Sequence, residues 1–143
     1  MVEKEKIRDT VRSFLEQMGV KVIIWDPEAD RFVLPYDVLG HDITVYVAFM
    51  EDYTWVVTVA DIFDLGRLPQ GVSREALFHK LLTDNFLRYK NRYGIDWNNH
   101  LVALAEMRAD ELDFENFRTS YEGVLNSVVN FIESVAKEFN IPI

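Results

Sequence analysis

The chain has 143 residues, a size typical of one domain, and 49% of them are hydrophobic. Its 24 acidic and 15 basic side chains give a net charge of −9 at pH 7. This charge argues against nucleic acid and anionic membranes as partners, because both are bound through basic side chains. The absence of cysteine excludes disulfides, thiol catalysis and cysteine metal sites. No apolar run approaches the ~20 residues of a membrane span, and no apolar signal core follows the charged N-terminus. We therefore expect a soluble, cytoplasmic protein.

The N-terminal third predicts one helix followed by strands. Apolar residues at intervals of three and four predict a helix over 3–18, and Gly19 stands where a C-terminal cap is expected. Residues 20–25 are rich in β-branched side chains and predict a strand, which is followed by a turn over 26–30. A short strand is expected over 31–36, where a proline near its end favours a sheet edge.

A hairpin is the clearest local pattern in the sequence. Residues 41–49 and 53–60 both alternate, and Glu51-Asp52 between them predicts a tight turn. One face of the first strand is expected to carry Ile43, Val45, Val47 and Phe49. One side of the second strand is expected to carry Tyr53, Trp55, Val57 and Val59.

The second half predicts a loop, a helix, two strands and a final helix. Residues 61–72 hold two glycines and a proline and predict a loop. Ser73 is a natural N-cap for a helix that runs to about Tyr89. Two strands over 93–97 and 100–108 are expected to be joined through two asparagines.

The final helix is predicted from apolar residues that recur every three or four positions between 114 and 139. Either Asp110 or Asp113 is expected to cap its N-terminus. Pro142 follows the end of this pattern.

The order of these elements predicts a fold class. We expect a single α+β domain over 1–143 with the order α-β-β-β(-β)-α-β-β-α. Clustered strands with short turns favour antiparallel pairing, and helices set apart from strands favour the α+β class. The sheet is expected to have five to six strands, with the terminal helices packed on one face.

Motifs for catalysis or metal binding are missing from the sequence. No metal-ligand spacing links the three histidines, His41, His79 and His100. The acidic residues between Asp110 and Glu115 are explained by the helix dipole at the start of the last helix. We therefore expect no catalytic residues, no metal site and no cofactor.

The middle helix carries more apolar surface than one contact with a sheet requires. At 100° per residue its apolar arc covers about half of the helix, whereas a stripe of about 100° suffices. Asn85 falls inside this arc, and we expect it to cap a strand end or a turn. The excess width favours either a homodimer or burial between the sheet and loop 61–72.

The expected sheet also has apolar residues on both faces. Both faces of 101–105 are apolar, and Trp25, Tyr46 and Val56 add apolar area to the expected outer face. If the terminal helices cover one face, a partner chain, a bound peptide or the middle helix is needed on the other. The candidate partner or dimer surface comprises Phe78, Leu82, Phe86, Leu87, Tyr89, Val102 and Leu104.

Four stretches of sequence carry a resemblance to a known family. They are Leu81-Leu82-Thr83-Asp84-Asn85-Phe86, Tyr93-Gly94-Ile95-Asp96, Leu101-Val102-Ala103-Leu104-Ala105-Glu106 and Leu112-Asp113-Phe114. With the order of elements, they resemble the YbjN and type III secretion chaperone-like domains over nearly the whole chain. The resemblance implies a small acidic cytoplasmic protein, often a homodimer, that holds another polypeptide and has no known catalysis.

Three functions follow as hypotheses. The first is a non-enzymatic, chaperone-like or regulatory homodimer that binds a protein or peptide client. The second is a small-molecule site or enzyme between the sheet and loop 61–72, with Asp61, Asp64 or His100 as polar groups. The third is nucleic-acid binding through a local basic cluster, which the net charge disfavours; its residues are Lys80, Arg88, Lys90 and Arg92.

Overall fold

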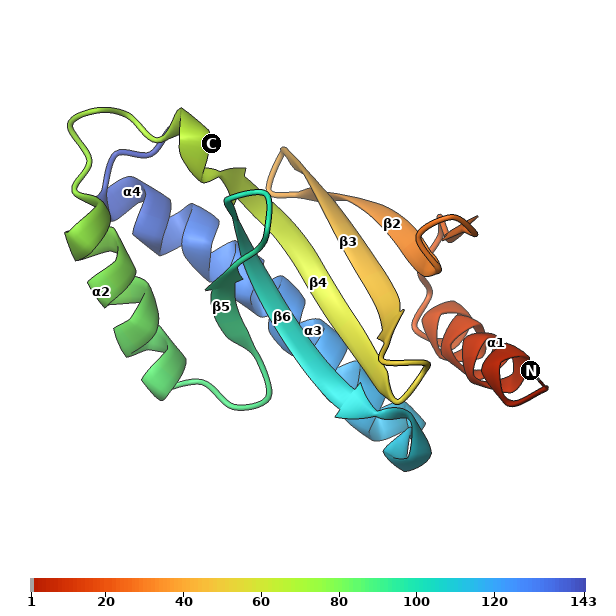
Figure 1. Ribbon diagram of the computed structural model, residues 1–143. Helices are drawn as coiled ribbons and strands as arrows, with labels where there is room; N and C mark the ends of the chain where they lie inside the picture. The colour runs from red at the N-terminus through yellow and green to blue at the C-terminus, as the bar shows by residue number, and fades with distance from the viewer. Residues whose placement is uncertain (1) are drawn as a thin grey trace.

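The structure is a computed structural model that describes residues 2–143. Its strands form one antiparallel sheet in the order β1-β2-β3-β4-β6-β5 (Figure 1). The strands are β1 (Ile24–Asp26), β2 (Arg31–Val38), β3 (His41–Met50), β4 (Trp55–Asp64), β5 (Arg92–Ile95) and β6 (His100–Arg108). The helices are α1 (Val2–Gln17), α2 (Arg74–Phe86), α3 (Phe114–Asn130) and α4 (Ala136–Glu138). A π-helical stretch over Phe131–Val135 joins α3 to α4. The predicted α+β class and antiparallel sheet are confirmed, with four strands before α2.

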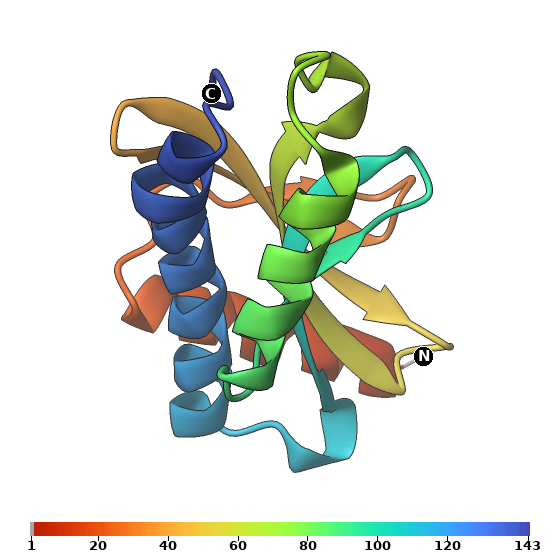
Figure 2. The ribbon, with the colours of Figure 1, turned by 90° about the vertical axis from the view of Figure 1, so that its left-hand side faces the viewer.

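The two terminal helices pack together over the same face of the sheet. The ring of Phe14 in α1 lies 5.5 Å from that of Phe114 and 5.7 Å from that of Phe117, both in α3. Figure 2 shows α3 and α4 on one side of the sheet, with α2 beside them. One sheet face is therefore covered by helices, as predicted.

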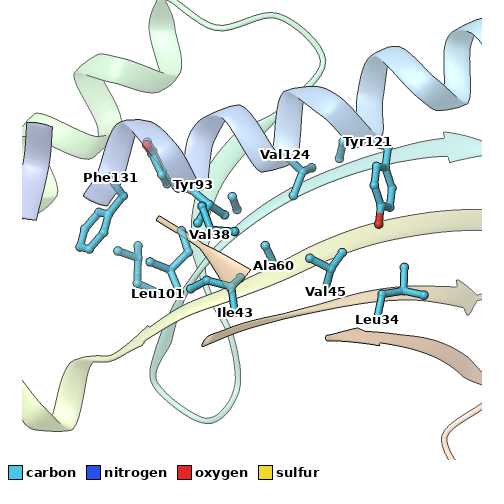
Figure 3. Packing of buried hydrophobic residues seen from close by; sticks show 14 of the residues in the cluster. Leu34, Val38, Ile43, Val45, Ala60, Tyr93, Leu101, Tyr121, Val124 and Phe131 are labelled. Carbon is cyan, nitrogen blue, oxygen red and sulfur yellow. The ribbon is translucent and has the colours of Figure 1, made fainter. Parts of the chain in front are cut away.

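The main core fills the space between α3 and the sheet. Val124 of α3 and Phe131 of the π-helical stretch point toward Val45 of β3, Ala60 of β4 and Leu101 of β6 (Figure 3). All five side chains are buried. This layer is the part of the molecule in which hydrophobic burial stabilises the fold most.

The β3–β4 hairpin follows its predicted alternation in β3 but has an unexpected orientation in β4. Ile43, Val45, Val47 and Phe49 are buried on one face, as expected. In β4 the core side carries Val56, Thr58 and Ala60, because Val56 lies opposite Phe49 in the ladder. The prediction of Val56 on the outer face was therefore wrong. Tyr53 belongs to the turn, with a φ of 66°.

The placement of Trp25 also differs from the sequence prediction. Its ring lies 5.0 Å from Phe32 and 6.3 Å from Phe49, so Trp25 belongs to the core face. The strand predicted over 20–25 is shorter, because only Ile24–Asp26 pairs with β2. Pro35 is tolerated in β2 because β1 pairs only as far as Val33, so Pro35 lies where β2 has β3 alone as a neighbour.

The predicted loop over 61–72 is partly strand. β4 continues to Asp64, with a bulge between Asp61 and Phe63, and a single 3₁₀ turn over Leu65–Arg67 follows. The strand therefore ends four residues later than the residue 60 predicted from the sequence. The two asparagines do join β5 to β6, with Asn99 at a φ of 63°.

The predicted helix caps are present at both later helices. The Ser73 side chain accepts a 3.1 Å hydrogen bond from the Ala76 N–H, and the Asp113 side chain accepts one of 2.9 Å from the Asn116 N–H. Of the two candidate caps for the last helix, Asp113 is the one used. No helix within residues 2–143 is long and apolar enough to cross a membrane.

Candidate interaction surface

The position of α2 follows from the strand order. β6 lies beside β4, and β5 lies outside β6, so the chain must cross to the sheet edge before β5 begins. α2 makes this crossing and lies next to β5 at the edge of the sheet (Figure 1). It is anchored to the core through Leu77 and Leu81, which are its two buried residues.

The opposite flank of α2 and the residues after it expose large apolar side chains. The exposed fractions are 67% for Leu82, 90% for Phe86, 71% for Leu87 and 90% for Tyr89. We call these four residues the helix patch. Because they are exposed, the alternative in which the middle helix is sunk between the sheet and loop 61–72 was wrong. The part of the apolar arc that carries Leu82 and Phe86 is therefore exposed on the protomer, whereas the part that carries Leu77 and Leu81 is buried.

Asn85 connects the end of α2 to the sheet edge. Its side-chain oxygen accepts a 2.8 Å hydrogen bond from the Tyr93 N–H, and its side-chain nitrogen donates a 3.1 Å bond to the Tyr93 carbonyl. The amide thus satisfies both backbone groups of Tyr93, as a neighbouring strand would. This contact fixes α2 against β5.

The segment between α2 and β5 is held against α3. Ser127 accepts a 3.0 Å hydrogen bond from Arg88, and its hydroxyl also bonds to the side-chain oxygen of Asn91. The Tyr93 hydroxyl donates a 2.7 Å bond to the Ser127 carbonyl and accepts one of 2.9 Å from Asn130. Burial raises the pKa of Tyr93 above its usual value. Leu87 and Tyr89 therefore project from an ordered segment rather than a free loop.

The seven residues proposed as a partner surface lie in three environments. Leu82, Phe86, Leu87 and Tyr89 form the helix patch, and Phe78 is half-buried against the core. Val102 is buried, so it adds nothing to a free surface. Leu104 is half-buried and lies on the sheet face opposite the helices, because its neighbours Ala103 and Ala105 face the core.

Sequence reasoning missed two further exposed side chains, which lie at the opposite end of β5 from the helix patch (Figure 1). Ile95 ends β5, and Trp97 lies in the β5–β6 turn with 97% of its surface exposed. Trp97 lies in the polar sequence Asp96-Trp97-Asn98-Asn99. A large apolar residue in a polar turn indicates an exposed side chain, so the sequence could have predicted this exposure.

The basic cluster near α2 is engaged in contacts within the protomer. Lys80 pairs with Asp84 at 3.4 Å, and Arg92 makes a two-point pair with Glu106 at 3.0 and 2.9 Å. Lys90 bonds to Asn116, and the Arg88 guanidinium lies over the Tyr93 ring. These contacts reduce the charge available to phosphates and weaken the nucleic-acid hypothesis.

The polar residues suggested for a small-molecule site do come together. Nδ1 of His100 lies 2.9 Å from Oδ1 of Asp61, and its Nε2 lies 4.0 Å from Oδ1 of Asp64. The hydrogen bond that Asp61 accepts from the His100 ring raises the pKa of His100 above its usual value. Asp96 holds the same turn by accepting 2.9 Å bonds from the N–H groups of Asn98 and His100. Within residues 2–143, no group of three or more His, Cys, Asp or Glu side chains is arranged to hold a metal ion.

Comparison with solved structures identifies the fold. No protein-family model and no curated protein sequence matches the chain. A chain in the structure of the HopA1–SchA chaperone–effector complex matches with a TM-score of 0.70 and 10% identity, over 94% of this chain and 98% of that one. A chain in the crystal structure of the ExsC–ExsE complex matches with a TM-score of 0.65 and 18% identity, over 90% and 92%.

A third similar structure is that of a type III secretion chaperone. It is a chain in the crystal structure of the Yersinia pestis type III secretion chaperone SycH in complex with a stable fragment of YscM2. The match has a TM-score of 0.60 and 12% identity, over 87% of this chain and 98% of that one. The chain therefore has a type III secretion chaperone-like fold, as its sequence resemblance implies. At these identities the likeness concerns the fold alone, and the resemblance to YbjN stays a prediction.

Proposed function

We propose that this protein is a non-enzymatic, chaperone-like or regulatory protein-binding module that acts in the cytoplasm as a homodimer. The observation that carries the proposal is the helix patch, with its four large apolar side chains more than two-thirds exposed on an ordered surface. Leu82 and Phe86 lie one helical turn apart, and exposed apolar side chains at neighbouring positions are typical of protein contacts. The patch is therefore assigned to the dimer contact.

The energetics favour association through this patch. Burying apolar surface contributes roughly 25 cal/mol per Å², and fully burying a Leu or Phe side chain contributes about 1.5–3 kcal/mol. In a two-fold symmetric dimer both copies bury the same residues, so each position of the patch contributes two buried side chains. The bonds that Asn85 and Ser127 make within the protomer order the patch before association, which lowers the entropic cost of binding.

The fold supports a polypeptide as the partner. Two of the similar structures are complexes, of SchA with HopA1 and of SycH with a stable fragment of YscM2. A fold alone does not establish a function, so the argument for this chain depends on its own exposed residues. A protein or peptide client is accordingly proposed in addition to the second copy.

Light scattering after size exclusion tests the dimer contact. We expect the wild-type protein to have twice the mass of one 16.8 kDa chain and the Phe86→Arg variant to have the mass of one. Ser13→Arg is the matched control, because Ser13 is exposed on α1, at the other end of the molecule from α2 (Figure 1), and receives the same charge. A monomeric wild type, or equal masses for the two variants, would contradict the proposal.

A small-molecule site at the ends of β4 and β6 is the second candidate. The 2.9 Å contact between His100 and Asp61, with Asp64 beside it, is the observation that favours it. Thermal-shift screening tests this function. A ligand that stabilises the wild type and has no effect on the Asp64→Ala variant would support it, since binding to the folded state raises the melting temperature.

A further inference from the structure

The sheet face opposite the helices is uncovered and unusually apolar. The helices cover one side of the sheet (Figure 2). On an antiparallel sheet with one solvated face, the outward positions are normally polar. Here the outward positions of the central strands carry valine, tyrosine and leucine instead.

These apolar residues lie side by side across five strands. The ladder places Ile24 opposite Val33, Val33 opposite Tyr46, Tyr46 opposite Val59 and Val59 opposite Leu104. We call this row the sheet band. Ile24 is 49% exposed, and the other four are half-buried. With strands about 4.8 Å apart, the band spans about 19 Å, which is the length of about 13 residues of α-helix.

One side of the band is bordered by neutralised arginines. Arg31 lies 3.5 Å from Asp26, and its guanidinium is stacked 4.1 Å from the centre of the Tyr46 ring. Arg108 makes two hydrogen bonds to the carboxylate of Asp110. Glu106 on the same side accepts two from Arg92, which lies opposite Leu104 at the β5 end of the band. Each positive charge on this border has its own negative charge, so the border has little net charge.

The other side of the band is bordered by carboxylates that lack such partners. Asp37 and Asp42 lie directly opposite each other in the β2–β3 ladder, where like charges repel. Asp61 lies opposite Thr44 in the same region and has His100 beside it. Among residues 2–143, neither Asp37 nor Asp42 has a cationic side chain within 4.0 Å. This acidic border is net negative.

The charges beside the sheet band distinguish two possible binding partners, a second copy of this chain and a positively charged polypeptide. A second copy stacked on this face by a two-fold axis would bring its acidic border over the neutral border or over the first copy's acidic border, so neither arrangement pairs opposite charges. A partner with positive charge along one side of an apolar surface would match both the band and the border.

We propose that the sheet band and its acidic border bind a polypeptide segment in which apolar side chains are flanked by lysine or arginine. The inference rests on the proposed protein-binding function and names the chemistry of the client. It uses a different face from the helix patch, so client binding and dimerisation are compatible.

Two synthetic peptides test this inference on the full chain. One is a labelled 14-residue amphipathic peptide with leucines on one face and lysines along one flank, and its twin carries glutamate in place of each lysine. We expect the lysine peptide to bind at least about tenfold more tightly in fluorescence anisotropy, with a preference that falls as salt rises. Equal affinities, or no binding of either peptide, would overturn the proposal.

Two variants locate the binding site. Asp42→Lys reverses an exposed charge of the border, and we expect about a fivefold or greater loss of affinity for the lysine peptide. Glu16→Lys on α1 is the control, because it makes the same charge change on the helix-covered side. Val59→Glu places a charge in the band and should abolish binding, once circular dichroism shows that the variant is folded. Equal affinities of the Asp42→Lys and Glu16→Lys variants would contradict the proposal.

The Phe86→Arg variant separates this inference from the proposed dimer. If the lysine peptide binds this variant as it binds the wild type, the sheet band is independent of the helix patch. If Phe86→Arg abolishes peptide binding and Asp42→Lys does not, the peptide binds the helix patch. That result would overturn the sheet-band site and leave the protein-binding function standing.

Discussion

Phe117 and Phe86 show how differently the same side chain is used in two regions of the molecule. Phe117 of α3 is 1% exposed and belongs to the core, whereas Phe86 of α2 is 90% exposed in the helix patch. The core under α3 stabilises the chain as a protomer. The helix patch contributes nothing comparable inside the protomer, so its apolar surface remains available for a partner.

Truncation of these two residues should give the largest contrast. Phe117→Ala should lower the free energy of unfolding by about 3–5 kcal/mol, because it removes buried contacts and leaves a cavity. Phe86→Ala, measured where the protein is monomeric, should change it by no more than about 0.5 kcal/mol. Urea unfolding followed by circular dichroism measures both. Similar losses in the two variants would show that Phe86 is packed within the protomer.

Asn85→Ala tests the connection between the two regions. The substitution removes both side-chain bonds to Tyr93 and leaves two backbone groups of a buried residue without partners. We expect a loss of about 1–3 kcal/mol in the free energy of unfolding. Amide hydrogen exchange should show faster exchange at the end of α2 and in β5, while α3 stays protected. Unchanged exchange in α2 would mean that Leu77 and Leu81 suffice to hold the helix.

Ser73→Ala should have a smaller effect on the same helix. Ser73 caps α2 through its bond to the Ala76 N–H, and loss of such a cap costs about 1 kcal/mol. Replacement by asparagine, another strong capping residue, should restore most of the loss. Equal stabilities of the wild type, Ser73→Ala and Ser73→Asn would show that the cap contributes nothing to the position of the patch.

The smallest expected effect is a pH dependence at His100. Its pKa is raised in the folded state, mainly by the hydrogen bond to Asp61. The stabilisation is therefore complete below the unfolded value near 6.5 and is lost as pH rises through the folded pKa. Urea unfolding between pH 5.5 and 9 should show this decline in the wild type and a weaker one in Asp61→Asn. Identical pH profiles would contradict the assignment.

Local patterns were sufficient to predict most of the secondary structure. The alternation in 41–49, the Ser73 cap and the repeat of apolar residues in 114–139 each depend on neighbouring residues, and each prediction was confirmed. The antiparallel α+β sheet followed from the order of these elements. The loop predicted over 61–72 failed because a bulge after Asp61 disturbs the alternation of a strand that continues to Asp64.

Contacts between distant residues were the part that the sequence did not reveal. Trp25 and Val56 belong to the core face because of their neighbours Phe32 and Phe49 on other strands, and no local pattern encodes that orientation. The pairing of His100 with Asp61 also depends on the β4–β6 register. For α2, the sequence indicated excess apolar width, but only the fold separates its buried flank from the exposed helix patch.

The most direct test of the central claim is the accessibility of the helix patch in solution. The chain has no cysteine, so a Leu82→Cys variant carries a single thiol in the patch. Ser13→Cys provides the control, because Ser13 is exposed on α1, at the other end of the molecule from α2 (Figure 1). Maleimide labelling rates of both variants are compared at low and high protein concentration. We predict that labelling of the Leu82→Cys variant slows at least about tenfold as the dimer forms, while the control rate stays constant. Equal rates for both variants at every concentration would show that no second copy covers the patch.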